Sequence, residues 1–140
     1  MDFVVLLGRI LFGTLAIRSA LLGHFGNTDG LAGYAEARGV KSGARALVLI
    51  SGVMLLLAGV SIILGIWPDL GALLYFLFLV PTAFLIHHFW TDDDPMAKQT
   101  EQTQFMKDMA LAGAALIAFT YFVTVGEAGP FQITGSLFDL

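Results

Sequence analysis

The chain has 140 residues, of which 57% are hydrophobic and 13% are charged, with a net charge of −4 at pH 7 and no cysteine. Soluble domains carry about 25% charged residues, so a chain with this few charges is typical of membrane proteins. The mildly acidic balance excludes a nucleic-acid partner, and the lack of cysteine excludes disulfides, thiol redox chemistry and iron–sulfur ligation within the chain.

The first predicted membrane span runs from about Phe3 to Leu22, roughly one bilayer thickness at 1.5 Å per residue. No cleavable signal is expected, because no basic segment precedes the apolar run and two arginines interrupt it. We interpret Arg18 as reaching the headgroups. We expect Arg9 to face the bundle interior, because a membrane-centre arginine costs about 2.5–3.5 kcal/mol. There it would either donate to neighbouring backbone or bind an anionic or quinone-like head group.

A polar segment, His24 to Gly43, follows the first span. Asp29 is a candidate N-cap and Gly39 a candidate C′ residue, which predicts one short helix over Gly30–Arg38. This helix is too short and too polar to span a bilayer. We therefore expect it to lie in the membrane interface or to be a re-entrant piece covered by protein.

The second and third predicted spans cover about Ala44–Trp67 and Gly71–Trp90. A very short turn at Pro68 separates them, so they are expected to be antiparallel neighbours. Pro81 lies within the third span, where it removes a backbone donor and is expected to bend the helix.

The fourth predicted span starts in water, with Asp94 as N-cap and Pro95 at the first helical position. It is expected to enter the membrane near residues 105–107 and to end at about Val125. Small residues that let membrane helices approach closely recur every four positions, at Ala110, Ala114 and Ala118. Residues 1–125 thus form a transmembrane domain, and residues 126–140 form a tail expected in the interface or against another subunit.

These elements predict an all-α fold, an integral membrane four-helix bundle with one short interfacial or re-entrant helix between spans one and two. Both termini and the turn at Pro68 then lie on one side, and they carry no lysine or arginine outside the membrane. The other two connections and their edges carry the basic residues Arg38, Lys41, Arg45, Lys98 and Lys107. Because cytoplasmic loops are enriched in such residues, we expect both termini to lie outside the cytoplasm.

The alternation of spans gathers polar side chains at one end of the bundle. They are Arg18, His24, Arg45, His87, His88, Gln104 and Lys107. Since this set is mostly cationic, the histidines are expected to be neutral at pH 7. We also expect at least one of them to contact a neighbouring helix, a lipid or a quinone head group.

Several functions fit a polar rim on an apolar bundle. Arginine and histidine donors beside an apolar cavity suit a quinone, lipid or anion, whereas a plainer interpretation is that the rim anchors the protein among lipid headgroups. His24 with His87 or His88 forms a possible but weaker haem-ligand pair. No catalytic residue and no metal site are predicted, because the two adjacent imidazoles point apart on a helix and no further ligand shares a face with either.

Four segments together resemble the DoxX family of small four-helix membrane proteins over about residues 4–125. They are LLGRILFG at 6–13, GLAGYAEARGV at 30–40, HHFW at 87–90 and EQTQFMKDMALAGAAL at 101–116. The resemblance implies the characteristic positions Arg9, one of His87 and His88, Gln104, Phe105 and Lys107.

The family's name comes from a subunit of a thiosulfate:quinone oxidoreductase or quinol oxidase. The resemblance therefore implies an accessory subunit of a quinone-linked redox assembly in a bacterial cytoplasmic membrane, with other membrane subunits or a second copy as partners. The sequence itself requires no cofactor, and the resemblance makes a quinone the first candidate and haem the weaker one. An autonomous thiosulfate–quinone oxidoreductase, a haem protein and a small-molecule transporter stay open as alternatives, although no membrane-embedded acid is expected.

The chain departs from the family pattern in three places. Many members carry a glutamate early in span two, where this chain has Ser51, and a basic residue in the following turn, where it has Trp67, Pro68 and Asp69. Asp108 stands where asparagine is common. If the missing glutamate is the usual partner of Arg9, this arginine must be satisfied in another way.

Overall fold

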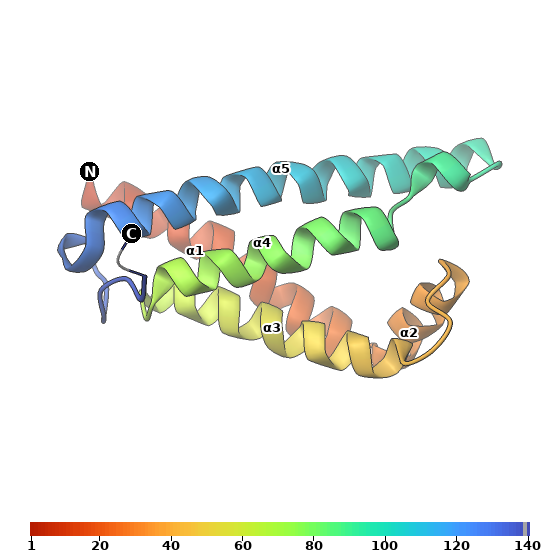
Figure 1. The fold of residues 1–140 in the computed structure, drawn as a ribbon, viewed down its shortest axis with the longest axis horizontal. Helices are drawn as coiled ribbons and strands as arrows, with labels where there is room; N and C mark the ends of the chain where they lie inside the picture. Colours follow the sequence, from red (N-terminus) through yellow and green to blue (C-terminus); the bar gives the residue numbers. More distant parts are fainter. Residues whose placement is uncertain (139) are drawn as a thin grey trace.

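The computed structural model describes residues 1–138 and residue 140, and it is all-helical over these residues (Figure 1). Its α-helices are α1 (Asp2–Arg18), α2 (Thr28–Ala37), α3 (Ala44–Leu64), α4 (Pro68–Leu85) and α5 (Pro95–Val125). The π-helical segment η1 (Ser19–Phe25) continues α1, and the 3-10 turns η2 (Phe89–Thr91) and η3 (Gly126–Ala128) precede and follow α5. Four helical stretches are long and apolar enough to cross a membrane, which confirms the four predicted spans by length and composition.

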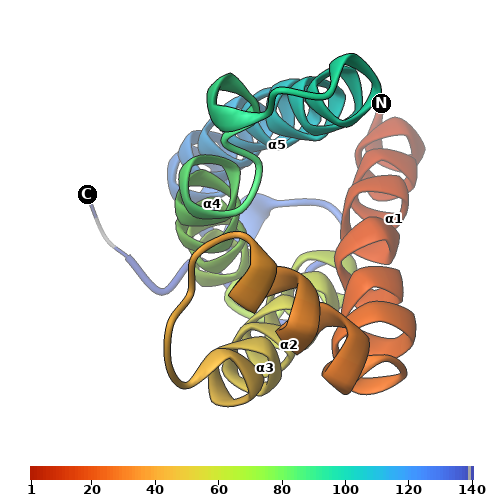
Figure 2. The ribbon, with the colours of Figure 1, turned by 90° about the vertical axis from the view of Figure 1, so that its right-hand side faces the viewer.

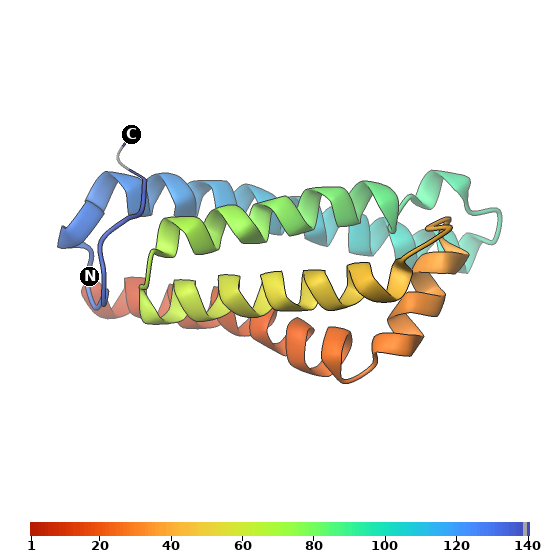
Figure 3. The same ribbon diagram turned by 60° about the horizontal axis from the view of Figure 1, so that its bottom comes forward.

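The four long helices form an open ring rather than a closed one. Helix α1 packs along α3, α3 along α4 and α4 along α5, whereas α5 makes no comparable contact with α1 over the described residues (Figures 2 and 3). A hollow of about 400 Å³ lies between α1 and α5. The predicted small-residue ridge borders this hollow through Ala114 and Ala118, and the buried alanines of α5 are instead Ala112 and Ala115.

Helices α1 and α3 cross closely through two glycines. A Cβ atom added to Gly13 would lie 2.8 Å from the carbonyl oxygen of Gly59, and one added to Gly59 would lie 2.6 Å from that of Gly13. Such small residues let helix backbones meet where packing, rather than water exclusion, drives association. The main core beside this crossing consists of Ala16, Ala20, Leu55, Ala58, Ile62, Tyr75, Leu79 and Ala112.

Arg9 faces the bundle interior, as predicted, with an exposed fraction of 4%. Its guanidinium donates to the carbonyl oxygens of Ile62, Ile63 and Pro130 at 2.8, 2.8 and 2.7 Å. The first two carbonyls belong to the last turn of α3, which has no helical donors left for them. Backbone carbonyls therefore satisfy Arg9, which has no glutamate partner in span two.

The tail that begins at Gly126 folds back over the turn between α3 and α4. The carboxylate of the fully buried Asp69 accepts from the backbone N–H groups of Leu137 and Phe138 at 2.8–2.9 Å. The backbone N–H groups of Ile133 and Thr134 both donate to the Gly65 carbonyl. The tail is thus bound to its own bundle at the end that holds both termini (Figure 1), and a contact with lipid or another subunit stays a prediction.

Several predicted boundaries are displaced by a few residues. Helix α3 ends at Leu64 rather than Trp67, and α4 starts at Pro68 rather than Gly71. Helix α2 starts at Thr28, two residues before the prediction, with Asn27 as N-cap, because Asp29 pairs with Arg45 at 2.6 Å instead of capping. Gly39 does follow this helix with a φ of +100°, as expected of a C′ glycine. The predicted Asp94 cap is confirmed by its 2.7 Å contact with the N–H of Ala97.

The third predicted span matches the helical stretch Pro68–Thr91, but its α-helix ends earlier than predicted. Helix α4 starts at Pro68, but it ends at Leu85 rather than continuing to Trp90. Pro81 lies in its last two turns and gives the Leu77 carbonyl no N–H partner, which weakens the helix there. The two histidines consequently lie in a non-helical link before η2, where helix geometry does not fix the directions of their side chains.

Candidate functional site

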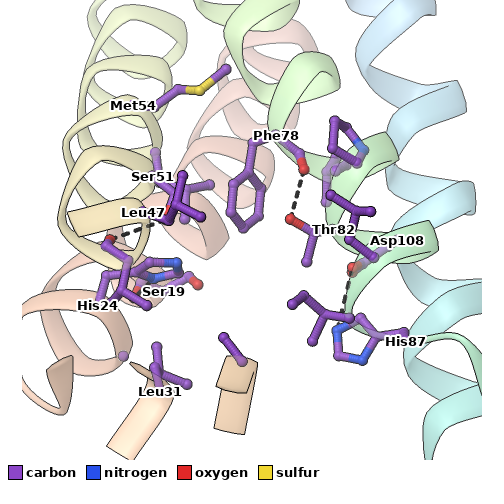
Figure 4. Close-up of a pocket in the computed structure, with 18 of the residues that line it drawn as sticks. Ser19, His24, Leu31, Leu47, Ser51, Met54, Phe78, Thr82, His87 and Asp108 are labelled. Atoms are coloured by element: carbon purple, nitrogen blue, oxygen red, sulfur yellow. Dashed lines mark hydrogen bonds and ion pairs between the residues drawn. The ribbon is translucent and has the colours of Figure 1, made fainter. Parts of the chain in front are cut away.

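A cavity of about 520 Å³ lies between η1, α2, α3 and α4 (Figure 4). Helices α3 and α4 are close at their connecting turn and diverge toward α2, so the cavity occupies the wide end of this pair (Figure 1). Most of its lining is apolar, including Met54, Leu55 and Phe78. The polar residues in the lining are Ser19, His24, Tyr34, Ser51, Tyr75, Thr82, His87, Lys107 and Asp108.

The cavity opens sideways between α3 and α4. Exposed apolar residues of the lining lie on both helices, Leu47 and Ile50 on α3 and Leu77 and Leu85 on α4. Its inner end, in contrast, is closed by fully or almost fully buried residues such as Leu55 and Tyr75. The cavity therefore has an apolar mouth on the flank of the bundle.

One polar wall is formed by the π-helical segment η1. The wider π turn brings the His24 Nδ1 atom to 3.1 Å from the Ser19 carbonyl oxygen, five residues earlier. Gly52 of α3 allows this approach, since a Cβ atom there would lie 2.7 Å from the Cβ of His24. The ring also packs edge-on against Phe78, with centroids 5.6 Å apart. Single π turns often occur at functional sites, and this one orients an otherwise buried imidazole toward the cavity.

The opposite polar wall is built around His87. Its Nδ1 atom lies 2.8 Å from Glu101 Oε2, and Tyr34 donates its hydroxyl to Glu101 Oε1 at 2.6 Å. Its Nε2 atom lies 3.7 Å from Asp108 Oδ2. The prediction that at least one histidine contacts a neighbouring helix is confirmed, because both carboxylates belong to α5.

The expectation of a mostly cationic surrounding for the histidines is wrong at His87. Glu101 and Asp108, which are only 8% and 4% exposed, are the charged groups that face its ring. Together with Asp69 they are the buried acids of the described residues. The two residues of α5 lie seven positions apart, which places them on one helical face with Ala112 and Ala115. This heptad spacing is the sequence signal that reveals their burial.

A second polar cluster binds α2 to the link after α4. Arg38 pairs with Asp92 at 2.6 Å and donates to the Ile86 carbonyl at 2.7 Å, while His88 Nε2 lies 2.9 Å from the Arg38 carbonyl. The hydrogen bond from Arg38 lowers the pKa of the Asp92 carboxyl, and the same bond raises the pKa of Arg38. Burial, followed by the hydrogen bond to Glu101, raises the pKa of Tyr34. These contacts hold α2 across the end of the bundle (Figure 2).

The six residues predicted to bind a ligand do not form one group. His87 and Lys107 line the cavity, and Gln104 accepts a hydrogen bond from Lys107. His88 is bound within the Arg38 cluster, Arg18 is exposed, and Arg9 lies at the opposite end beside the tail. Ligand binding by these residues stays a prediction. The structure adds His24, Ser19 and Asp108 to the polar groups of the cavity.

Comparison with known proteins places this geometry in context. A family model, DoxX, matches residues 4–88, which is more than half of the chain and includes His24 and His87 but not α5. Searches of curated proteins and of solved structures found no match. Within the described residues, no group of three or more histidine, aspartate or glutamate side chains is arranged to hold a metal ion.

Proposed function

This chain belongs to the DoxX family of membrane proteins, and from this premise we propose that it is an accessory subunit of a quinone-linked redox assembly. In this proposal it contributes helix packing and a site for a quinone or lipid head group, and it has no redox centre of its own. The absence of cysteine from the sequence supports a subunit that depends on its partners for electron transfer.

The observation that carries the proposal is the cavity between η1, α2, α3 and α4. Its volume of about 520 Å³ lies within the roughly 300–1,000 Å³ range of small-molecule sites. An apolar lining with a few polar groups on two walls suits an amphipathic ring with polar substituents. Because Glu101 and Asp108 stand at one wall, the cavity favours a neutral head group over an anion.

Purification from native membranes in mild detergent tests this proposal. We expect the chain to retain close to one quinone or quinol per copy, detected after solvent extraction, together with other subunits in fixed ratio. Ser51→Phe, which fills the cavity from α3, should abolish retention, whereas Val53→Phe on the exposed side of the same helix should not. A preparation with neither quinone nor a stoichiometric partner would contradict the proposal.

Haem is the second candidate, because His24 and His87 stand on facing walls (Figure 4). The carboxylate of Asp108 lies beside the Nε2 atom of His87, where an iron ion would have to bind, and this favours quinone over haem. An absorption spectrum of the native protein separates the two candidates. A Soret band that follows the protein through purification would establish haem and overturn the cofactor-free subunit.

An enzyme or a transporter would differ from a subunit in what the isolated chain does. Turnover of thiosulfate with quinone as acceptor by the isolated chain would support an autonomous oxidoreductase. Uptake into vesicles that contain only this chain would support transport, for which the buried acids Glu101 and Asp108 are the relevant groups. Neither activity is expected of an accessory subunit.

The proposed orientation places both termini outside the cytoplasm. The end of the bundle that holds α2 carries Arg38, Lys41, Arg45 and Lys98, and the end with the termini holds only the buried Arg9. This distribution supports a cytoplasmic α2 end. Reporter fusions to either terminus that are active only outside the cytoplasm test it, and activity only inside would reverse it.

A further inference from the structure

Two polar atoms that line the cavity make no hydrogen bond with any described residue. One is the hydroxyl of Tyr75, a residue that is only 2% exposed, and the other is the Oδ2 atom of Asp108, which is 4% exposed. Over residues 1–138 and 140, no side-chain nitrogen or oxygen that is sealed from its surroundings lacks a partner. These two atoms therefore have surface open to the cavity. Asp108 is also the charged group that acts electrostatically on the Tyr75 hydroxyl.

The neighbouring carboxylate, that of Glu101, has both of its oxygens bonded. One oxygen accepts from the Tyr34 hydroxyl at 2.6 Å, and the other accepts from His87 Nδ1 at 2.8 Å. The Asp108 Oδ2 atom, in contrast, lies 3.7 Å from His87 Nε2, which is too far for a direct hydrogen bond (Figure 4). Asp108 is thus the buried anion of the cavity that can still accept a hydrogen bond from a ligand.

The charges of this wall do not cancel while His87 is neutral. Glu101 and Asp108 carry two negative charges. Lys107 supplies one positive charge at 3.4 Å from Asp108 Oδ1, on a side chain that is 51% exposed. One negative charge is left beside a largely apolar cavity, where a charge without a partner is costly. A bound monovalent cation cancels this charge.

The shape of the cavity restricts the kind of cation that fits. Its mouth on the flank of the bundle is apolar, so a ligand that enters from the bilayer must carry an apolar tail. A primary ammonium group has three N–H donors and no acceptor, which matches the open oxygen atoms of Asp108 and Tyr75. The rings of Tyr75 and Phe78 also belong to the lining, and aromatic rings attract cations.

We propose that the cavity binds a lipophilic primary ammonium ion, with its –NH₃⁺ group at Asp108 and its tail in the mouth between α3 and α4. The ammonium group donates to Asp108 Oδ2 and to the Tyr75 hydroxyl oxygen. Two sources have this chemistry, a free long-chain amine and the ethanolamine head group of a phospholipid. The inference rests on the cavity being a ligand site, as proposed above, but not on the ligand being a quinone.

Three probes with the same ten-carbon tail test the head group on the purified chain in dodecyl maltoside micelles. They are decylamine, decanol and decyl sulfate, whose head groups are cationic, neutral and anionic. Calorimetric titration, with empty micelles as the blank, should give decylamine a dissociation constant at least about tenfold lower than that of decanol, as expected of one hydrogen bond to a charged group. Decyl sulfate should show no saturable binding.

A proton competes with the ammonium ion for the same negative charge. The titratable and charged groups around Asp108 and the cavity are Tyr75 on α4, His87 in the link after α4, Glu101 and Lys107 on α5, Tyr34 and Arg38 on α2, and His24 on η1. Arg38 is already paired with Asp92. A second proton on His87 cancels the charge that the ammonium would cancel, and histidines ordinarily change charge between pH 5 and 8.

Binding of decylamine should therefore be at least about threefold weaker at pH 6 than at pH 8, while binding of decanol should not change. Decylamine itself stays cationic at both values, since alkylammonium groups such as that of lysine have a pKa of about 10.4. An affinity for decylamine that is the same at both values would contradict the competition with a proton.

Variants assign the binding to the proposed atoms. Asp108→Asn keeps the shape of the side chain and removes its charge, so it should weaken decylamine binding at least about tenfold and leave decanol binding unchanged. Asp93→Asn, the same exchange at an exposed position, is the matched control and should change neither. Tyr75→Phe removes only the hydroxyl and should weaken decylamine binding about threefold to tenfold. If Asp108→Asn does not fold, Tyr75→Phe and the three probes on the unmodified chain still decide the question.

Phospholipids added to the micelles identify the source of the ammonium group. Displacement of decylamine by phosphatidylethanolamine, but not by phosphatidylcholine, whose quaternary ammonium has no N–H donor, would assign the site to a lipid head group. Displacement by neither phospholipid would assign it to free amines.

The outcomes separate this inference from the proposed function. Equal affinities for decylamine and decanol, or decylamine binding that Asp108→Asn leaves unchanged, would overturn the ammonium site, whereas quinone retained by the same preparation would leave the quinone site intact. If decylamine binds as expected and no quinone is retained, the quinone-linked function fails while the ammonium site stands.

Discussion

The two ends of the bundle hold their buried charges in different ways. At the end with the tail, Arg9 donates to three backbone carbonyls and Asp69 accepts from two backbone amides. At the end with α2, His87 meets side chains, and its Nε2 atom together with one oxygen of Asp108 stays open. A charged group whose hydrogen bonds are all made by backbone stabilises the fold, whereas a group with an unmade hydrogen bond can still bind a ligand.

The largest effect on stability is expected when the backbone-bonded charge of Arg9 is removed. Arg9→Met leaves three carbonyls without their donor, and each such group costs about 1–3 kcal/mol, so the free energy of unfolding should fall by about 3 kcal/mol or more. Thermal unfolding in detergent measures the change. Arg18→Met is the control at an exposed position and should stay within about 0.5 kcal/mol. Equal effects of the two substitutions would show that the buried contacts of Arg9 contribute little.

A smaller effect, confined to the tail, is expected at Asp69. Asp69→Asn exchanges one acceptor oxygen for an NH₂ group that faces the amides of Leu137 and Phe138, at a cost of about 1–2 kcal/mol. Carboxypeptidase should then digest the tail faster, while ligand binding at the other end stays unchanged. Asp93→Asn, at an exposed position, should alter neither. Loss of ligand binding in Asp69→Asn would show that the two ends are coupled.

Within the α2 end, the two histidines are expected to differ in their effect on ligand binding. His87→Phe should lower quinone retention about tenfold, because one polar wall is lost, whereas His88→Phe should retain the ligand, because His88 is bound to Arg38 and Thr91 outside the cavity lining. Both variants, and the double variant, should still insert into membranes. If the double variant retains the same amounts of quinone and of partner subunits, both histidines are interface residues without a role in binding.

The smallest effect concerns pH at the Arg38 cluster. Because the pKa of Asp92 is lowered in the folded chain, its ion pair stabilises the fold above the pKa of the unfolded aspartate, and this stabilisation is lost as pH falls through the lower folded value. Melting temperatures of the unmodified chain should therefore converge on those of Asp92→Asn in acid and exceed them near neutral pH. A constant difference across this pH range would exclude the ion pair as the cause.

The sequence predicts those parts of the fold that depend on local properties. Span length and apolar composition identify four membrane helices, the Asp94–Pro95 pair marks the start of α5, and the desolvation cost of an arginine turns Arg9 inward. The end of α4 at Leu85 and the π-helical turn before Phe25 have no comparable local signal. Both depend on how neighbouring helices pack, for example on the room that Gly52 leaves for η1.

The sequence predicts that His87 and Lys107 lie together at one end of the bundle, but it does not predict the charges around His87. Counting cations along the chain predicts a mostly cationic surrounding, because it ignores how each helix is rotated. The rotation of α5 buries Glu101 and Asp108 and leaves Lys107 at the exposed edge. The heptad spacing of the two acids shows that they share one face of α5. It predicts their burial only once Ala112 and Ala115 identify that face as the buried one.

The sideways mouth between α3 and α4 determines how a ligand arrives. In a bilayer the exposed side chains of Ile50 and Leu85 at this mouth face acyl chains rather than water. A ligand then reaches the cavity by two-dimensional diffusion within the leaflet. Its rate of binding depends on how strongly it partitions into the bilayer rather than on its aqueous concentration. In the proposed redox assembly, the same route would allow the ligand to pass between this chain and a neighbouring subunit at this flank without crossing water.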